Sequence, residues 1–223
     1  MGGEKSKALL PIGKTSVIQH VLRIFQEHPA IERICVVARK QDFESLNAML
    51  AGRSKGRELA ALVEGGAERQ DSVWRGIAAL QADPPDWVLV HDGARPFCSP
   101  ALLERVLDGL NKRQAVVPVI PIQDTVRRID GARSEVVDRS GLFRCQTPQG
   151  FHWNTLLDAH QRAKQVGLMA TDDAQLVEAA GQDVAFVEGE TRNLKITTAS
   201  DLAAAEWILN NPAWGTSAEG GSA

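Results

Sequence analysis

Apolar segments alternate with amphipathic segments along most of this chain, and this alternation restricts the fold more than any other feature of the sequence. The apolar runs that predict strands are 31–38, 58–66, 86–96, 115–122 and 183–189. The helical periodicity predicts helices at 16–28, 41–50, 69–81, 100–112, 153–166, 172–180 and 198–210. Strands that alternate with helices form βαβ units. We therefore predict an α/β fold with a Rossmann-like, mostly parallel sheet and helices on both faces.

The alternation of predicted strands and helices stops at residues 123–150. In this region single polar and apolar residues alternate instead. Turn signals stand at Asp130-Gly131 and Ser140-Gly141. Such turns join antiparallel strands. We therefore predict an antiparallel β-arm, at about residues 121–146, that is inserted into the order of the sheet.

Composition restricts the partners and the compartment. The formal net charge of −3 provides no general attraction to nucleic acid or to an anionic membrane. No apolar run approaches the ~20 residues that span a bilayer, and the start lacks the apolar stretch of a signal peptide. Three scattered cysteines without a CxxC pair argue against a disulfide framework or a zinc site. We expect a cytoplasmic protein with no nucleic-acid or membrane partner.

No internal repeat and no linker divides the chain. We therefore predict a single domain over residues 1–210. Residues 211–223 are small and polar, and we predict that they form a disordered tail.

The segment GKTS at residues 13–16 resembles a phosphate-binding loop. A Walker A loop needs a glycine five positions before its Gly-Lys pair, and Ala8 stands there instead. Ser16 and Gln19 have the spacing of a capping box. We therefore interpret GKTS as a turn that caps the next helix.

Two glycine-containing turns follow predicted strands, where ligands bind in open α/β sheets. In VLVHDGARP (88–96), Asp92 is placed to hold a metal or a hydroxyl and Arg95 to hold a phosphate. A plain Asp-Gly turn with a surface arginine fits the same residues. In VEGGAERQDSVWRG (63–76), the glycines allow a ligand to approach the backbone, and a serine follows in the helix; an ordinary connecting loop fits equally.

Other polar residues can be explained by ordinary structural roles as well as by functional ones. Thr171 and Asp172 fit a helix N-cap with first-turn acids. Lys195 stands in a short apolar segment, 193–197, that we interpret as a strand, where a lysine usually faces solvent. The histidines are too dispersed to form a ligand set, and no GxSxG elbow is present. Nucleophilic serine or cysteine catalysis and zinc hydrolysis therefore lose support.

Several stretches together resemble one family, the 2-C-methyl-D-erythritol 4-phosphate cytidylyltransferases of the non-mevalonate isoprenoid pathway. These stretches are KALLPIGKTSVIQHVL, VEGGAERQDSV, WVLVHDGARP, DTV, VDRSGLFRCQTPQGF, TDDA and EGETRNLKITTASDLAAAE. They cover about residues 1–210 in the family's order and spacing. The resemblance implies a nucleotidyltransferase-type sheet. It also implies that a cytidylyl group passes from CTP to methylerythritol phosphate, which gives 4-diphosphocytidyl-2-C-methyl-D-erythritol and pyrophosphate.

The resemblance also implies roles for particular residues. The catalytic residues would be Lys7, which stabilises charge on the triphosphate, and Arg139 with Lys195, which grip the phosphate of the substrate. The substrate-binding residues would be Asp92, Arg95, Thr125, Thr147 and Thr171. The nucleotide-binding residues would be Gly2, Gly3, Gly65, Gly66, Ala67 and Ser72.

The cofactor implied by the resemblance is Mg²⁺, carried mainly by the phosphates of CTP, with Asp92 as a candidate ligand. The arm would form a homodimer, in which Arg139 and Thr125 complete the active site of the neighbouring subunit. Ala67 stands where some members have an acidic residue, so a contact there would use the backbone.

Family members open with an apolar strand and a glycine-rich loop that contains an arginine, whereas this sequence begins at what resembles the last methionine of that loop. We therefore expect that the first, central strand is missing from this sequence and that the native chain is longer. Two alternatives stay open. One is a cytidylyltransferase for another polyol phosphate, such as ribitol 5-phosphate, and the other is a truncated, non-catalytic binding protein of the same fold.

Overall fold

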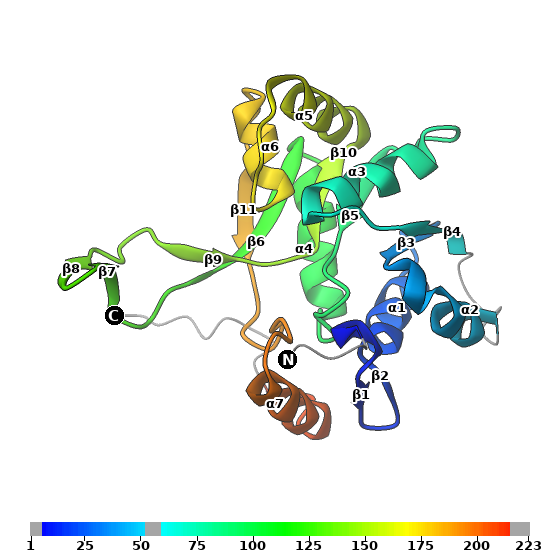
Figure 1. Ribbon diagram of the computed structural model, residues 1–223, viewed down its shortest axis with the longest axis horizontal. Coiled ribbons are helices and arrows are strands. Elements are labelled where there is room, and N and C mark those ends of the chain that lie inside the picture. The colour runs from blue at the N-terminus through cyan, green and yellow to red at the C-terminus, as the bar shows by residue number, and fades with distance from the viewer. Residues whose placement is uncertain (1–5, 52–58, 215–223) are drawn as a thin grey trace.

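The computed structural model describes residues 6–51 and 59–214 of the chain (Figure 1). Its largest sheet has five strands. In spatial order they are β11 (Ala185–Glu188), β6 (Ala115–Pro121), β10 (Gln149–His152) and β5 (Trp87–Val90), with β9 (Phe143–Cys145) paired to the far end of β6. β11 runs parallel to β6, whereas β10 is antiparallel to both of its neighbours. The predicted Gly2 and Gly3 sites and residues 215–223 of the predicted tail lie outside the described residues.

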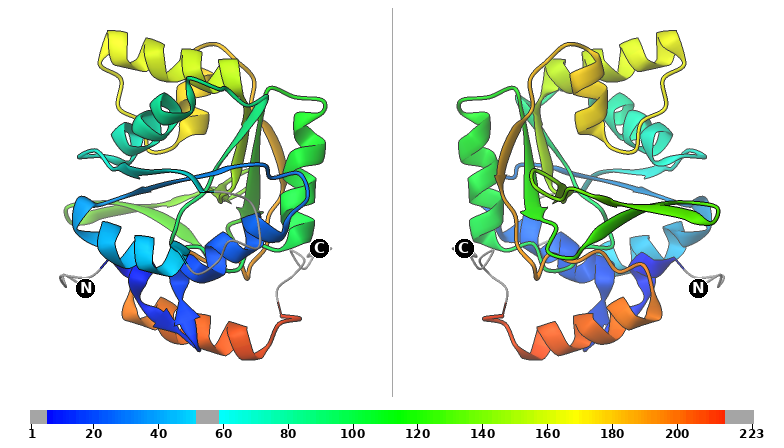
Figure 2. Two further views of the ribbon diagram at one scale, coloured as in Figure 1. Left: turned by 90° about the vertical axis from the view of Figure 1, so that its right-hand side faces the viewer. Right: turned by 90° about the vertical axis from the view of Figure 1, so that its left-hand side faces the viewer.

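Helices cover both faces of this sheet, as Figure 2 shows. The helices are α1 (Val17–Glu27), α2 (Phe43–Ala51), α3 (Arg69–Leu80), α4 (Pro100–Leu110), α5 (Trp153–Val166), α6 (Asp173–Ala179) and α7 (Ala199–Asn210). α4 packs on one face and shares a core with α1, while α5 and α6 pack on the other face and share a core with α3. The predicted α/β class with helices on both faces is confirmed, with a sheet that combines the parallel β11–β6 pair with antiparallel strands.

The GKTS segment is a turn and a helix cap, as predicted. Short strands β1 (Pro11–Ile12) and β2 (Thr15–Ser16) pair across it, and α1 follows directly. The side-chain Oε1 of Gln19 accepts hydrogen bonds from the backbone N–H (3.0 Å) and the Oγ (3.2 Å) of Ser16.

None of the helices in the described part of the chain combines the length and apolar character that a bilayer crossing requires.

A second, parallel pair of strands lies beside the main sheet without pairing to it among the described residues. It consists of β3 (Ile34–Ala38) and β4 (Leu59–Glu64). A cavity of about 520 Å³ lies between β3 and β5, and α1 and α3 form its other walls.

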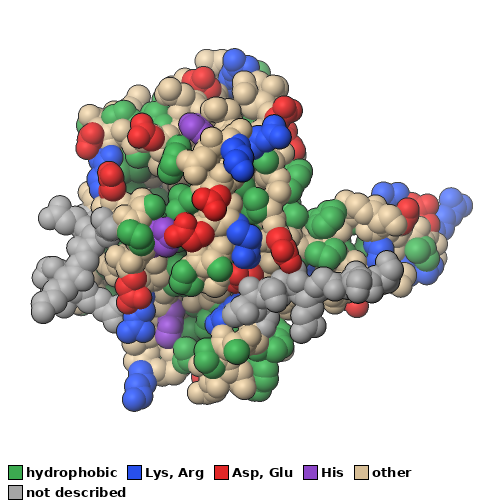
Figure 3. All heavy atoms as spheres, turned by 180° about the vertical axis from the view of Figure 1, so that it is seen from behind, with side chains coloured by type: hydrophobic (Ala, Val, Ile, Leu, Met, Phe, Trp, Pro, Cys, Tyr) green, Lys and Arg blue, Asp and Glu red, His purple; other side chains and the backbone are tan. Residues whose placement is uncertain are grey.

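The arm projects from the body of the molecule (Figure 1). It is an antiparallel hairpin of β7 (Val126–Asp130) and β8 (Arg133–Val137), joined at the predicted Asp130-Gly131 turn. Hydrophobic side chains lie along the arm and charged side chains at its tip (Figure 3). The exposed fractions of Ile129, Val136 and Phe143 are 72%, 60% and 50%.

Two predicted boundaries in this region are wrong. Residues 149–152 form the buried strand β10 between β5 and β6, whereas the sequence pattern predicts no strand there and includes residues 149 and 150 in the polar region 123–150. The pattern hides β10 because it has only four residues and begins at the last residue of the polar QTPQ segment. Residues 193–197 form no strand and run as an extended loop.

The close packing of β10 on α4 leads to a stability prediction. A Cβ atom on Gly150 would lie 2.8 Å from Val106 Cγ1 and 2.9 Å from Leu110 Cδ1. We expect Gly150→Val to lower the free energy of unfolding by roughly 2–3 kcal/mol through overpacking. Ala79→Val, on the exposed side of α3, serves as a control and should cost about 0.5 kcal/mol. Equal urea midpoints for the two variants would contradict the tight contact.

Candidate active site

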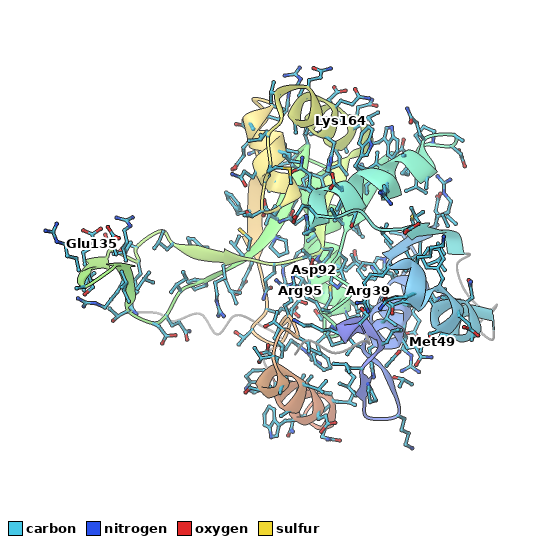
Figure 4. All side chains as sticks on the ribbon, viewed as in Figure 1. Arg39, Met49, Asp92, Arg95, Glu135 and Lys164 are labelled. Atoms are coloured by element: carbon cyan, nitrogen blue, oxygen red, sulfur yellow. The ribbon has the colours of Figure 1, made fainter. Side chains whose placement is uncertain are left out.

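Asp92 lies just beyond the end of β5, and three cationic side chains lie close to its carboxylate. Its Oδ2 lies 3.1 Å from Lys195 Nζ and 3.2 Å from Arg95 Nε, and its Oδ1 lies 3.6 Å from Arg69 Nε. Figure 4 shows Asp92 and Arg95 together near the centre of the molecule. The predicted pair of Asp92 and Arg95 is therefore brought together with Lys195, which lies 100 residues after Arg95 in the chain.

The charges of this cluster keep Asp92 ionised. Burial alone would raise the pKa of Asp92, but the charges of Lys195, Arg95 and Arg69 hold it below its ordinary value. Burial lowers the pKa of Arg95, and the charges of Arg144 and Arg69 lower it further, whereas Asp92 raises it. An arginine stays charged throughout the ordinary pH range. The site therefore presents three cations to one shared carboxylate, an arrangement suited to an anionic ligand.

Thr147 holds the Asp92 loop in place. The backbone N–H of Asp92 donates to Thr147 Oγ1 over 3.1 Å, and Thr147 Oγ1 lies 3.2 Å from His91 Nδ1. His91 Nε2 lies 3.0 Å from the carbonyl oxygen of Arg95, which can only accept, so this ring nitrogen carries the proton. His91 Nδ1 then accepts from the Thr147 hydroxyl. Thr147 is only 5% exposed, so in this structure its hydroxyl positions the loop that carries Asp92 and Arg95.

A buried polar network fixes the loop that carries Lys195. The side chain of Gln146 exchanges two hydrogen bonds with the backbone of Glu190 (2.8 and 3.0 Å). The Glu190 carboxylate is fully buried and accepts from Ser99 Oγ at 2.5 Å and from Arg105 Nη2 at 3.0 Å. Asn193 donates to the Thr147 carbonyl over 2.8 Å. These bonds fix the loop, so that the side chain of Lys195 extends from it to a position close to Asp92.

Two further bonds join the same loop to the rest of the site. Arg95 Nη1 donates to the carbonyl of Asn193 over 2.8 Å, and the N–H of Ile196 donates to the carbonyl of Ala94 over 2.9 Å. Lys7, in the short helix η1 (Lys7–Leu9), donates from Nζ to the carbonyl of Thr197 over 2.7 Å. The predicted catalytic residues Lys7 and Lys195 are therefore held by the same loop.

The predicted nucleotide-binding turn is built around Ser72 and the start of α3. Ser72 Oγ accepts from the N–H of Gly66 over 3.0 Å and donates to the carbonyl of Glu68 over 3.1 Å. A Cβ atom on Gly66 would lie 2.2 Å from Asp71 Cβ, so only glycine fits there. Arg75 donates to the carbonyl of Gly65 over 2.9 Å. The exposed Ala67 forms the tip of this turn, and Arg69, at the start of α3, lies with its Nε 3.6 Å from Asp92 Oδ1.

Thr171 is exposed in the loop before α6, where its backbone N–H donates to Gln175 Oε1 over 3.0 Å. Asp172 caps α6 by accepting from the N–H of Gln175 over 3.0 Å, which confirms the helix-cap interpretation of Asp172. The next residue, Asp173, pairs with Arg69 Nη1 over 2.7 Å. The loop of Thr171 is thereby linked to the Asp92 cluster.

Thr125 and Arg139 lie apart from this cluster. Both are exposed, Thr125 just before β7 and Arg139 just after β8, on the projecting arm. Within one chain, the structure does not bring them to Asp92. Their predicted roles in the site of a neighbouring subunit stay predictions.

Sequence patterns did not identify several residues that build the site: Arg69, His91, Asp173, Glu190 and Asn193. His91 and Arg69 stand within the two glycine-containing stretches, 88–96 and 63–76, so position in such a turn was an available signal. Glu190, Asn193 and Asp173 become significant only through burial and partners that are distant in sequence.

Comparison with known proteins places this chain in a family. The family model of IspD, 2-C-methyl-D-erythritol 4-phosphate cytidylyltransferase, matches residues 1–211. The chain belongs to this family. The cytidylyltransferase of Syntrophotalea carbinolica is 40% identical over 213 residues, which are 95% of this chain and 91% of that protein. The crystal structure of the cytidylyltransferase from Thermus thermophilus matches with a TM-score of 0.77 and 38% identity, over 92% of this chain and 94% of that one.

A further relative is about twice as long. The bifunctional enzyme IspD/IspF of Rhodospirillum rubrum is 41% identical over 209 residues, which are 93% of this chain and 53% of that protein. The matched region is thus one part of that bifunctional protein.

The role of Thr147 in holding the loop leads to a stability prediction. We expect Thr147→Val to lower the free energy of unfolding by about 1–3 kcal/mol, because the N–H of Asp92 loses its acceptor. Thr147→Ser keeps the hydroxyl and loses a methyl group, which should cost about 0.8 kcal/mol or less. Urea unfolding measures both. If the valine variant were as stable as the serine variant, the hydroxyl would have no structural role.

The environment of His91 leads to a pH prediction. Burial of the imidazole lowers the pKa of His91 to about 4, below its ordinary value. The unfolded chain then binds a proton that the folded chain does not, so the free energy of unfolding should decrease as pH falls from about 6.5 towards 4. His91→Gln should flatten this decrease in urea unfolding between about pH 7 and pH 5. An unchanged slope would show that His91 titrates normally.

Proposed function

We propose that this protein transfers a cytidylyl group from CTP to 2-C-methyl-D-erythritol 4-phosphate in isoprenoid precursor biosynthesis, with the Asp92 cluster as the site that receives the alcohol phosphate. The observation that carries this proposal is the convergence of Arg69, Arg95 and Lys195 on one carboxylate, in a chain that belongs to the cytidylyltransferase family. The products are 4-diphosphocytidyl-2-C-methyl-D-erythritol and pyrophosphate.

The reaction needs positioning and charge neutralisation rather than a general base. A phosphate monoester has a second pKa near ~6 and is already a nucleophile at neutral pH. Its oxygen attacks the α-phosphorus of CTP, a new P–O bond forms, and the bond to the bridging oxygen of the β-phosphate breaks to release pyrophosphate. Cations that neutralise the reacting phosphates and hold them in line therefore supply most of the rate enhancement.

Lys195 is the cation best able to reach a substrate phosphate. Its side chain is 43% exposed, whereas that of Arg95 is 12% exposed and fixed by Asp92 and the carbonyl of Asn193. Asp92 keeps Lys195 aimed at the site before the substrate arrives and is placed to accept hydrogen bonds from substrate hydroxyls. In this proposal Lys7, whose Nζ contacts the carbonyl of Thr197, neutralises charge on the triphosphate.

The nucleotide belongs at the turn of residues 65–72 in this proposal. The peptide groups of Gly65, Gly66 and Ala67 lie at the carboxyl end of β4, where ligands bind in open α/β sheets. Ser72 supports this turn through its bonds to Gly66 and Glu68. Thr171, exposed beyond the turn, is the remaining substrate-binding candidate.

A divalent cation would enter with CTP rather than bind a protein site. Both carboxylate oxygens of Asp92 already face cations, which does not suit a direct metal ligand. No group of three or more metal-ligating side chains occurs in residues 6–51 and 59–214. We therefore propose Mg²⁺ as part of the nucleotide substrate, bound to its phosphates.

We also propose that the catalytic unit is a homodimer formed through the arm. Ile129 and Val136 are exposed on the β7–β8 hairpin, which no other element of the described chain covers in Figure 1, and Phe143 is exposed at the start of β9. A partner subunit would bury these side chains and receive Arg139 and Thr125 beside its own Asp92 cluster.

A cytoplasmic location, where thiols stay reduced, suits the three free cysteines, Cys35, Cys98 and Cys145.

Turnover of the two candidate alcohol phosphates tests the substrate. With CTP and Mg²⁺, we expect release of pyrophosphate with methylerythritol phosphate at a kcat/KM at least ~10-fold above that with ribitol 5-phosphate. A preference for ribitol 5-phosphate would identify a sister activity. Release with neither substrate would favour a non-catalytic binding protein of this fold.

The role of Lys195 is tested by Lys195→Ala, which should lower kcat/KM by about 10²-fold or more, because one phosphate-neutralising charge is lost. Lys112→Ala, in the exposed turn after α4, is the control and should leave kcat/KM within about twofold. Full activity of Lys195→Ala would remove Lys195 from the mechanism.

Mixing two inactive variants tests the shared site. If Arg139 acts in the partner's site, a mixed dimer of Lys195→Ala and Arg139→Ala chains has one site with both changes and one intact site. After joint refolding at equal amounts, about one quarter of the wild-type activity should return. Failure of any activity to return, with mixed dimers present, would place Arg139 in the site of its own chain.

A further inference from the structure

A buried ion pair behind the active site links three separate segments of the chain. Asp173 begins α6 and is fully buried. Its Oδ2 accepts from Arg69 Nη1 over 2.7 Å, and its Oδ1 lies 2.8 Å from His160 Nε2 on α5. Burial alone would raise the pKa of Asp173, but the hydrogen bond from His160 and the charge of Arg69 hold it below its ordinary value. Asp173 is therefore a fixed negative charge inside the protein.

Arg69 occupies a position that helix energetics alone do not explain. It is the first residue of α3, where the helix dipole disfavours a cation. Burial would lower the pKa of Arg69, but Asp173 and Asp92 raise it overall. The two carboxylates that the guanidinium contacts account for an arginine here. Because the guanidinium is planar and rigid, anchoring Nη1 on Asp173 also sets the direction in which Nε faces Asp92.

The residue next to Arg69 holds the same neighbouring loop. Gln70 Nε2 donates to the carbonyl of Leu168 over 3.0 Å, and Gln70 Oε1 accepts from the N–H of Ala170 over 2.9 Å. Two adjacent side chains of α3 thus hold the loop that carries Thr171. Gln70 bonds to the backbone before Thr171, and Arg69 bonds to Asp173 after it. Of these two side chains, Arg69 also reaches the Asp92 cluster.

We infer that Arg69 is a positioning residue that sets Asp92 and the Thr171 loop relative to each other, and that Asp173 acts through it. This inference rests on the proposed function, because it assigns Arg69 to the alcohol-phosphate side of the site. The hydrogen bonds that hold the nucleotide turn internally come from Ser72 and Arg75 and not from the Arg69 side chain. Loss of the bridge should therefore impair one substrate more than the other.

The experiment compares Arg69→Lys, Asp173→Asn and the double variant with wild type. Lysine keeps the charge but cannot span two carboxylates with a rigid fork. We expect Arg69→Lys to raise the KM for methylerythritol phosphate about tenfold or more, with the KM for CTP changed by less than about threefold. The double variant should lose no more kcat/KM than the worse single variant, because both remove one bridge. Thermal unfolding confirms that each variant is folded at the assay temperature.

Arg33→Lys is the matched control. Arg33 also pairs with a carboxylate over 2.8 Å, but that partner, Asp83, is 85% exposed and makes no contact with the Asp92 cluster. This variant should keep both KM values within about twofold. The inference is overturned if the KM values for the two substrates rise equally in Arg69→Lys, if kcat/KM is unchanged, or if the two single losses multiply. A wild type without turnover overturns the proposed function, and this inference with it.

Discussion

The carboxylate of Asp92 is the group on which the organisation of this site depends. Three cations from three different parts of the chain converge on it: Arg69 from α3, Arg95 from the loop after β5, and Lys195 from the loop before α7. Without the negative charge, these cations would repel one another at close range. A single carboxylate therefore allows a cation-rich site to exist in the folded protein before an anionic ligand arrives.

The surrounding structure holds this cluster with buried polar contacts. Thr147 fixes the backbone of Asp92, and the Gln146, Glu190 and Asn193 network fixes the loop of Lys195. Buried polar groups are costly unless they are paired, so each contact constrains where its loop can lie. This gives a physical reason why a site assembled from loops can keep a defined geometry. Such preorganisation is what transfer between two phosphorylated substrates requires.

The sequence predicted well those features that arise from local patterns. The helices, the Ser16 cap, the arm and the strand-end placement of Asp92 follow from periodicity, capping residues and turns, and the structure confirms them. β10 was missed because a four-residue strand held by pairing on both sides has no periodicity of its own. Asp173 and Glu190 were missed because they differ from surface acids only in their burial and in partners 104 and 85 residues away.

The most direct test of the account is the activity of Asp92→Asn, which keeps the shape of the side chain and removes its charge. The measurement is kcat/KM with CTP and methylerythritol phosphate, together with thermal unfolding to establish that the variant is folded. If Asp92 organises the three cations, kcat/KM should fall by about 10²-fold or more in the folded variant. A folded Asp92→Asn protein with kcat/KM within about twofold of wild type would contradict the central claim.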